Sequence, residues 1–228
     1  MLRQDVWDNL TDHFDTYKAQ PDRGVLANVE QTWPNLVLVL QKLPPNGKVL
    51  DFGCGTGGLC NRLHTLGFQV AGTDISPRMI DVARAHSPES IDYWVSDGKV
   101  RRPSDHYHLI TALMVFQFIE DLQDVLCVLS DSLSSDGMLW FTAHNPSYVF
   151  HPANTHTRFE DLEPHVIPKK ATVVLSGQRI QTFVRDADEY ERQCSAAGLE
   201  KLHEWYSEPF ADGTPSKYLV MTFRRKGR

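Results

Sequence analysis

The sequence predicts an α/β protein whose core is a mostly parallel β-sheet. Short apolar segments of strand length alternate with helical periodicities between residues 48 and 143, which is the pattern of strands joined by helical crossovers. The segment 109–116 is almost entirely apolar and is therefore expected to be buried on both faces, as strands of parallel sheets are. The chain has 228 residues, of which 41% are hydrophobic, so it is long enough to bury one large core.

Two helices are expected before the sheet begins. An amphipathic helix is predicted at 5–17, because apolar side chains recur there at helical spacing. A second helix is predicted at 25–42, broken or bent at Trp33–Pro34. We assign residues 1–44 to an N-terminal helical lid.

Strands and helices then alternate through a central core at 45–145. The expected strands are 48–52, 68–73, 91–95, 109–116 and 138–143, and the expected helices are 59–66, 76–86 and 121–133. Ser76 is expected to cap one of these helices, with Pro77 at its first position. Strands in this alternation predict a parallel sheet with right-handed crossovers.

The pattern loosens after residue 145. The segment 148–168 is interpreted as a long loop or irregular cap, since it holds histidines and prolines without a clear periodicity. Beyond it we expect an antiparallel pair at 172–175 and 179–184, a helix at 186–197, and strands at 199–206 and 217–224. We treat 1–228 as a single domain, with a cap at 146–185 and completion of the sheet at 186–228.

Composition disfavours several classes of protein. The net charge of −6 argues against binding nucleic acid through bulk electrostatics. The longest apolar run, Leu36 to Leu40, is too short to cross a bilayer, and the polar beginning of the sequence does not fit a signal peptide. The four cysteines lack the spacing of a zinc site. We therefore expect a cytoplasmic monomer or homodimer with no metal, no membrane contact and no nucleic-acid partner.

A glycine-rich loop follows the first strand of the predicted sheet. Gly53, Gly55 and Gly58 match a generic dinucleotide-binding pattern, in which the backbone comes close to a ligand. Asp51, however, precedes the first glycine at the end of a buried strand, where its carboxylate would repel a pyrophosphate strongly even at an effective dielectric of about 20. The loop therefore favours a ligand with a cationic group, such as the ammonium and sulfonium of S-adenosylmethionine.

Two further acids end the next two strands. Asp74 follows the second strand, and Asp97 with Gly98 follows the third. The carboxyl ends of successive parallel strands meet along one crevice, so Asp74 can accept from both hydroxyls of a ribose and Asp97 from an adenine amine. Helix caps or exposed turn acids are the alternative, and three acids in register with the glycine loop disfavour it.

These segments resemble the motifs of class I S-adenosylmethionine-dependent methyltransferases. Residues 49–57 resemble the cofactor loop, 74–84 the second motif, 96–98 the third and 112–121 the fourth. The resemblance covers about 45–145, and 183–223 is similar to the tail of ubiquinone-biosynthesis-like and natural-product members. It implies a Rossmann-like, doubly wound, mostly parallel seven-stranded sheet with an antiparallel C-terminal strand and a substrate cap.

The resemblance also implies the cofactor, S-adenosylmethionine, with S-adenosylhomocysteine as product, and the residues that bind it. The expected cofactor-binding residues are Asp51, Gly53, Cys54, Gly55, Gly57, Asp74, Ile75, Met79, Asp97, Gly98 and Met114. The glycines would shape the loop, Asp74 would bind the ribose, and Ile75 and Met79 would contact the adenine. Gln117 stands where many small-molecule members of the family carry a histidine.

Methyl transfer is an in-line displacement, and proximity and orientation can lower its activation barrier by roughly 7–11 kcal/mol. A nearby base helps when the acceptor must lose a proton. Catalytic candidates are His144, His151 and Tyr17, the last of which could close its ring over the sulfonium. Candidate substrate residues are Gln117, Asn145, Tyr148 and His156. A surface or packing role for each histidine stays open.

The sequence thus predicts a methyltransferase that acts on an oxygen or nitrogen atom of a small-molecule acceptor. A protein, peptide or tRNA base as acceptor is one alternative. An NAD(P)-dependent oxidoreductase and a non-catalytic cofactor-binding protein are the alternatives from other classes.

Overall fold

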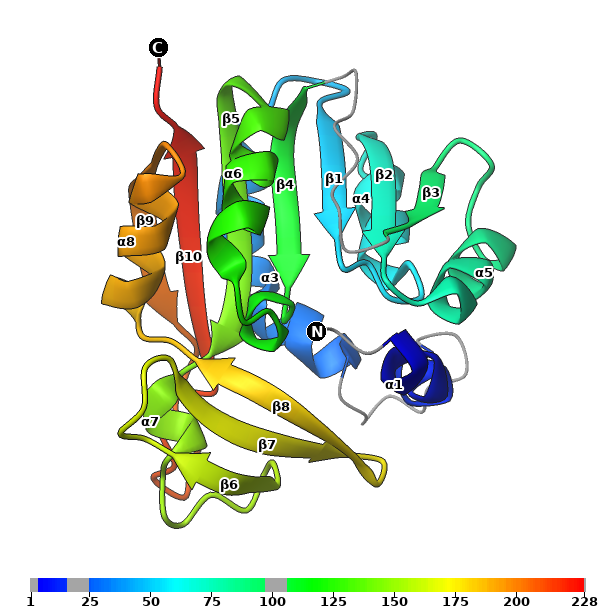
Figure 1. The fold of residues 1–228 in the computed structure, drawn as a ribbon. Coiled ribbons are helices and arrows are strands. Elements are labelled where there is room, and N and C mark those ends of the chain that lie inside the picture. The colour runs from blue at the N-terminus through cyan, green and yellow to red at the C-terminus, as the bar shows by residue number, and fades with distance from the viewer. Residues whose placement is uncertain (1–3, 16–24, 97–105, 228) are drawn as a thin grey trace.

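The computed structural model describes residues 4–15, 25–96 and 106–227 (Figure 1). Three of the residues with expected roles, Tyr17, Asp97 and Gly98, lie outside these ranges.

The core of the protein is a seven-stranded sheet in the order β3-β2-β1-β4-β5-β10-β9. Its strands are β1 (Lys48–Phe52), β2 (Gln69–Asp74), β3 (Asp92–Val95), β4 (Tyr107–Leu113), β5 (Leu133–His144), β9 (Leu199–Tyr206) and β10 (Tyr218–Arg225). All neighbouring strands are parallel except that β10 runs antiparallel to both β5 and β9. The predicted fold class, a mostly parallel seven-stranded sheet with one antiparallel C-terminal strand, is confirmed.

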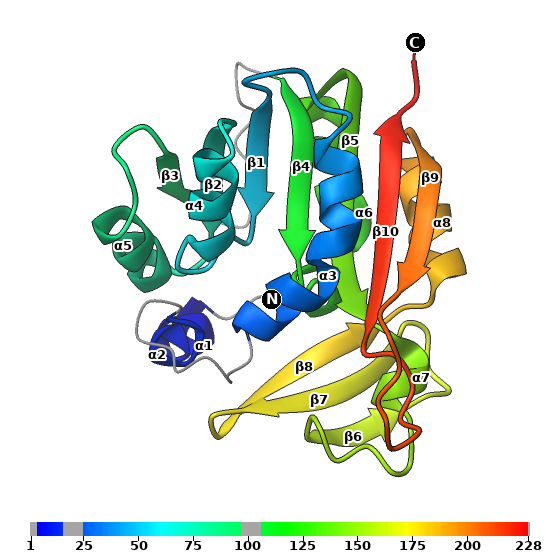
Figure 2. The ribbon, with the colours of Figure 1, turned by 180° about the vertical axis from the view of Figure 1, so that it is seen from behind.

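Helices cover both faces of the sheet, as in a doubly wound fold (Figures 1 and 2). The helices are α3 (Val25–Leu40), α4 (Gly58–Thr65), α5 (Pro77–Ala85), α6 (Leu122–Ser132) and α8 (Ala187–Ala196). One face buries apolar side chains from α3, α4 and α5, and the other buries those from α6 and α8. None of the described helices combines the length and the apolar character that a membrane span requires.

Helix α3 passes through Pro34 without losing its helical assignment. Figure 2 shows its axis turning partway along, which is the bend expected of an internal proline. Burial of Leu36 and Val39 against the sheet stabilises the helix on the far side of the proline and offsets the roughly 3 kcal/mol that proline costs in a helix.

The N-terminal segment forms two short helices, α1 (Gln4–Asn9) and α2 (Thr11–Phe14), where one continuous helix was predicted. Thr11 sits at the junction and donates its hydroxyl to the Asp8 carbonyl at 2.9 Å. Side chains that bond nearby backbone groups compete with regular helix formation, which explains why apolar spacing alone overestimated the helix.

The segment 148–168 was expected to be a loop, and this expectation is wrong in part. Asn145 and Pro146 start a short helix, α7 (Pro146–Val149), and residues 159–163 form a strand, β6 (Phe159–Glu163). The strand joins β7 (Lys169–Leu175) and β8 (Gln178–Val184) in an antiparallel sheet with the order β6-β7-β8. We call this small sheet together with α7 the cap (Figure 1).

The predicted strand at 109–116 is too long at its end. Strand β4 stops at Leu113, Met114 has a positive φ of 59°, and residues 116–118 form a 3-10 turn, η1 (Phe116–Phe118). The apolar run continues beyond the strand because Phe116 packs into the core from this turn. The turn brings Met114 and Gln117 to the carboxyl end of the sheet.

Candidate active site

A cavity of about 290 Å³ lies at the carboxyl ends of the central strands. Its lining comes from the loops after β1, β2, β4 and β5, from α1 and α2, and from the β7 strand of the cap. In Figure 1 these elements surround the lower end of the sheet, with the cap below it and α1 beside it. This is the place where open parallel sheets bind ligands.

The glycine loop between β1 and α4 has a backbone that other residues cannot easily adopt. Gly53, Gly55 and Gly57 all have positive φ angles, between 53° and 85°. A Cβ on Gly53 would lie 2.4 Å from a methyl carbon of Val115. Gly53 and Gly55 line the cavity, whereas Gly57 does not and Gly58 does. The loop therefore brings bare backbone up to the cavity wall.

Asp74 ties this loop to the start of α5. One carboxylate oxygen accepts from the Gly55 N–H at 2.9 Å and the other from the Ser76 N–H at 2.9 Å. Burial raises the pKa of Asp74, and these backbone hydrogen bonds oppose that rise. Each carboxylate oxygen can accept more than one hydrogen bond, so Asp74, which lines the cavity, can still receive hydroxyl groups.

Asp51 is a buried carboxylate that faces the cavity without a cationic partner among the described residues. The Thr111 hydroxyl donates to one of its oxygens at 2.8 Å, and the Cys60 thiol donates to the other at 3.6 Å. Burial raises the pKa of Asp51 to about 6, against the lowering effect of these two bonds. The carboxylate is thus charged at neutral pH but poorly stabilised by the protein, which makes it a good site for a ligand cation.

The remaining expected cofactor residues with described positions also border the cavity. Cys54, Ile75, Met79 and Met114 all line it. Ser96 joins them at the end of β3, next to the undescribed Asp97.

His144 is the catalytic candidate that the structure places on the cavity wall. Burial, together with the nearby Lys217 ammonium, lowers the pKa of its imidazole to about 3. The ring is therefore neutral at pH 7, and its Nδ1 atom has no hydrogen-bond partner among the described residues.

Gln117 also lines the cavity, from η1. Its side-chain amide donates to the Met114 carbonyl at 3.1 Å, while Oε1 is buried and without a partner among the described residues. Gln117 and His144 thus each present one buried polar atom for which the described part of the chain supplies no hydrogen bond.

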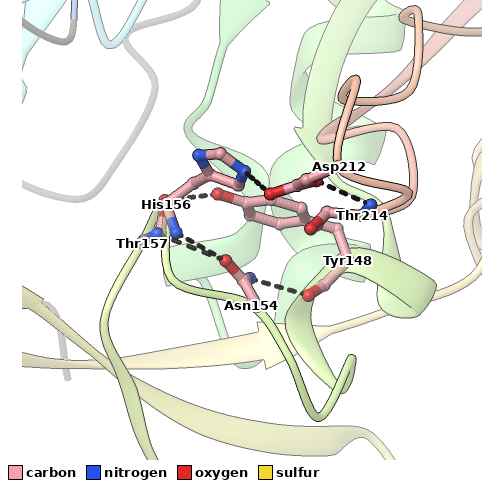
Figure 3. A network of polar contacts seen from close by, with 6 residues as sticks. All are labelled: Tyr148, Asn154, His156, Thr157, Asp212 and Thr214. Carbon is pink, nitrogen blue, oxygen red and sulfur yellow. Dashed lines mark hydrogen bonds and ion pairs between the residues drawn. The ribbon is translucent and has the colours of Figure 1, made fainter.

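Four other candidates do not line this cavity: Asn145, Tyr148, His151 and His156. Figure 3 shows what two of them do instead. The Tyr148 hydroxyl shares a hydrogen bond of 2.6 Å with Thr157, and His156 Nε2 lies 3.0 Å from the Asp212 carboxylate. The Tyr148 bond joins α7 to the segment that follows it, and the His156 contact joins this segment to the loop between β9 and β10. Thr157 itself reaches the cavity wall.

Asn145 has a structural task that uses both ends of its side chain. Its Oδ1 accepts from the Ser147 N–H at 3.1 Å, as an N-cap of α7, and its Nδ2 donates to the Ser216 carbonyl at 2.8 Å. We expect Asn145→Ala to reduce the free energy of unfolding by about 1–2 kcal/mol, as loss of a helix cap and a buried bond implies. Urea denaturation measures this change.

Ser147→Ala is the matched control for Asn145→Ala, since it removes a side chain from the same helix and leaves both Asn145 bonds in place. An Asn145→Ala protein as stable as Ser147→Ala would contradict the assigned role.

Several cavity residues were not anticipated from the sequence. Lys217, Thr157, Trp7 and Phe118 all line the cavity. Trp7 and Phe118 pack edge to face with ring centroids 4.8 Å apart, so α1 closes against η1. The one sequence signal for Lys217 was its position as an isolated basic residue before the apolar run of β10. Its backbone partner, Asn145, lies more than 70 residues away along the chain.

No group of three histidine, cysteine, aspartate or glutamate side chains in the described part of the chain is arranged to hold a metal ion. The cavity wall instead presents glycine backbone, two buried carboxylates and apolar side chains to a ligand. It fits S-adenosylmethionine, because Asp51 can bind a cation, Asp74 can accept hydroxyls, and Gly53 and Gly55 bring backbone without side chains to the cavity wall.

Comparison with known proteins gives a family match. A family model described as a methyltransferase domain matches residues 25–204 of this chain. An uncharacterised protein from Haemophilus influenzae is 29% identical over 153 residues, which cover 63% of this chain and 59% of that protein. A ubiquinone biosynthesis O-methyltransferase from a Shewanella species is 30% identical over 103 residues, which cover 43% of this chain and 44% of that enzyme.

The chain thus spans about half the length of the curated relatives it matches. Among solved structures, an S-adenosylmethionine-dependent methyltransferase from Mesorhizobium loti has a similar fold. Its TM-score is 0.67 at 21% identity, with 86% of this chain and 98% of that chain covered.

Proposed function

This chain belongs to the S-adenosylmethionine-dependent methyltransferase family, and we propose that it transfers a methyl group from S-adenosylmethionine to an oxygen or nitrogen atom of a small-molecule acceptor. The observation that carries the proposal is Asp51, a buried carboxylate on the cavity wall that lacks a cationic partner among the described residues. A donor with an ammonium group would stabilise the charged form of this carboxylate.

Different residues around the cavity would bind different parts of the donor. Asp51 would hold the ammonium, Asp74 the ribose hydroxyls, and Ile75 with Met79 the adenine. Gly53 and Gly55, which line the cavity, would let the backbone approach the donor closely. Asp97 and Gly98 keep their expected place at the adenine end as part of the proposal.

The bound donor supplies a methyl carbon on a positively charged sulfur: the acceptor lone pair bonds to that carbon, the carbon–sulfur bond breaks, and its electron pair stays on sulfur in S-adenosylhomocysteine. The protein contributes alignment and exclusion of water. Trp7 and Phe118 cover the cavity with apolar surface. Neutral His144 can accept a hydrogen bond, and through it a proton, from an acceptor hydroxyl, although a pKa of about 3 makes it a weak base.

A small acceptor agrees best with the size and enclosure of the site. The volume of about 290 Å³ lies just below the range of about 300–1,000 Å³ that is usual for ligand pockets, and elements from both ends of the chain border it. The proposal includes the expected cytoplasmic location, a monomer or homodimer, no nucleic-acid or membrane partner, and the division into lid, core, cap and sheet completion. Roles for Tyr17, His151, Tyr148 and His156 stay predictions.

A label-transfer assay tests the proposed reaction. The chain is incubated with S-adenosylmethionine carrying a tritiated methyl group and with panels of small hydroxyl compounds, small amines, peptides and tRNA. We expect label to move to a small molecule, with one S-adenosylhomocysteine formed per methyl transferred. Transfer to peptide or tRNA alone, or binding of the donor without any turnover, would contradict the proposal.

A further inference from the structure

The cavity has a second half in which the protein offers a positive charge. We call this half the acceptor side, defined by Gln117, His144, Lys217 and Val173, all of which line the cavity. It lies beyond the ends of β4 and β5, whereas Asp51 and Asp74 lie at β1 and β2 on the other side of β4.

Lys217 is fixed on the acceptor side by its backbone. Its carbonyl accepts from the Asn145 N–H at 2.9 Å, and the carbonyl of Ser216 accepts from the Asn145 side chain at 2.8 Å. The next residue, Tyr218, pairs with His144 across the β5–β10 ladder. The structure therefore holds Lys217 beside His144 at the adjoining ends of two neighbouring strands.

Among the described residues, no carboxylate compensates the charge of the Lys217 ammonium. Burial is the one influence on its pKa that the described residues supply, and the centroid of the Tyr218 ring lies 5.1 Å from the ammonium. Burial lowers its pKa. A partly buried cation in this position is stabilised by an anion that arrives with a ligand.

The other charges around the cavity do not supply that anion. Among the described lining residues the only carboxylates are Asp51 and Asp74, which face the proposed ammonium and ribose. A sulfonium would add a further positive charge. A cationic acceptor would therefore meet two positive charges, whereas an anionic acceptor would be attracted by both.

Two neutral groups complete the recognition surface. Gln117 Oε1 and His144 Nδ1 are buried and lack partners among the described residues. A ligand hydroxyl can donate to an amide oxygen or an imidazole nitrogen. Apolar side chains, among them Phe118, Val173 and Leu175, form the rest of this wall.

Resting on the proposed function, we propose that the methyl acceptor is a small organic acid with an apolar body, whose carboxylate binds the ammonium of Lys217. Its hydroxyl group lies at Gln117 and His144. The donor's own carboxylate is the other source of the same anionic chemistry, so the test separates the two.

The test measures binding of acid–amide pairs to the protein saturated with S-adenosylhomocysteine. The pairs are benzoate with benzamide, 4-hydroxybenzoate with 4-hydroxybenzamide, and cinnamate with cinnamamide, each measured by ligand-observed NMR. We expect at least one acid to bind the wild type about tenfold more tightly than its amide, as one charge-assisted bond implies. The ratio should fall to about one in Lys217→Met and persist in Lys217→Arg. Lys201→Met, on exposed β9, is the surface control.

Three results would overturn the inference. In the first, the wild type binds no acid more tightly than the matching amide. In the second, Lys217→Met keeps the preference for the acid. In the third, Lys217→Met weakens binding of S-adenosylhomocysteine but not of methylthioadenosine, which lacks the amino acid. The last result would assign Lys217 to the donor carboxylate. Failure of S-adenosylhomocysteine to bind the wild type at all would instead refute the proposed function.

Discussion

Replacing Asp74 with alanine is expected to weaken binding of S-adenosylhomocysteine by about 100-fold, as loss of two charge-assisted hydrogen bonds of about 1.5–3 kcal/mol each allows. The carboxylate would bind the ribose, and it also holds Gly55 and Ser76 through their backbone N–H groups. The variant therefore loses both the ligand contact and the support of the glycine loop. Isothermal titration of the full chain with S-adenosylhomocysteine measures the effect.

Asp81→Ala is the control for this substitution. Asp81 lies on the exposed face of α5, where its closest ion pair is a loose one with Arg84 at 3.9 Å. It should leave the affinity unchanged, and a thermal melt of both variants separates loss of binding from loss of folding. Wild-type affinity in Asp74→Ala would refute the placement of the ribose.

Lowering the pH from 7 to 5 is expected to weaken binding of S-adenosylhomocysteine about tenfold, because protonated Asp51 no longer attracts an ammonium group. Burial raises the pKa of this carboxyl to about 6, so it is charged above that pH and neutral below it. The same titration has an effect of opposite sign on the free energy of unfolding. The folded chain keeps the proton to higher pH than the unfolded chain does, so Asp51 lowers the free energy of unfolding as pH rises from about 4 to 6.

Asp51→Asn removes this pH dependence and keeps the shape of the side chain. The variant should bind S-adenosylhomocysteine about tenfold more weakly than wild type at pH 7, with little change down to pH 5. It also isolates Asp51 from Asp74, whose pKa is raised in the same direction. Equal pH profiles for the variant and the wild type would show that Asp51 does not hold the ammonium.

The sequence alone was sufficient for the parallel core and for the residues after β1 and β2 that line the cavity. The glycine loop, Asp51 and Asp74 lie within two consecutive strand–loop units, so local patterning and the rule for the carboxyl ends of parallel strands place them together. Ile75 and Met79 follow in the same way, from the helix start that Ser76 caps.

The acceptor side was harder to predict because distant segments build it. Lys217 reaches the cavity through the pairing of β10 with β5, and Trp7 through contacts of α1 with η1 and with the start of α5. The local sequence pattern around these residues does not predict those contacts. The number of histidines in the segment after residue 150 favoured a role for them at the site. In the structure His156 instead contacts the Asp212 carboxylate and stacks on Phe210, with ring centroids 3.9 Å apart.

A parallel titration of the wild-type chain with S-adenosylhomocysteine and with NADH at neutral pH tests whether buried Asp51 beside the glycine loop selects a cationic donor. We expect S-adenosylhomocysteine to bind with a dissociation constant of about micromolar order, and NADH not to bind up to about 1 mM. Tight binding of NADH, or no binding of S-adenosylhomocysteine at that concentration, would contradict it.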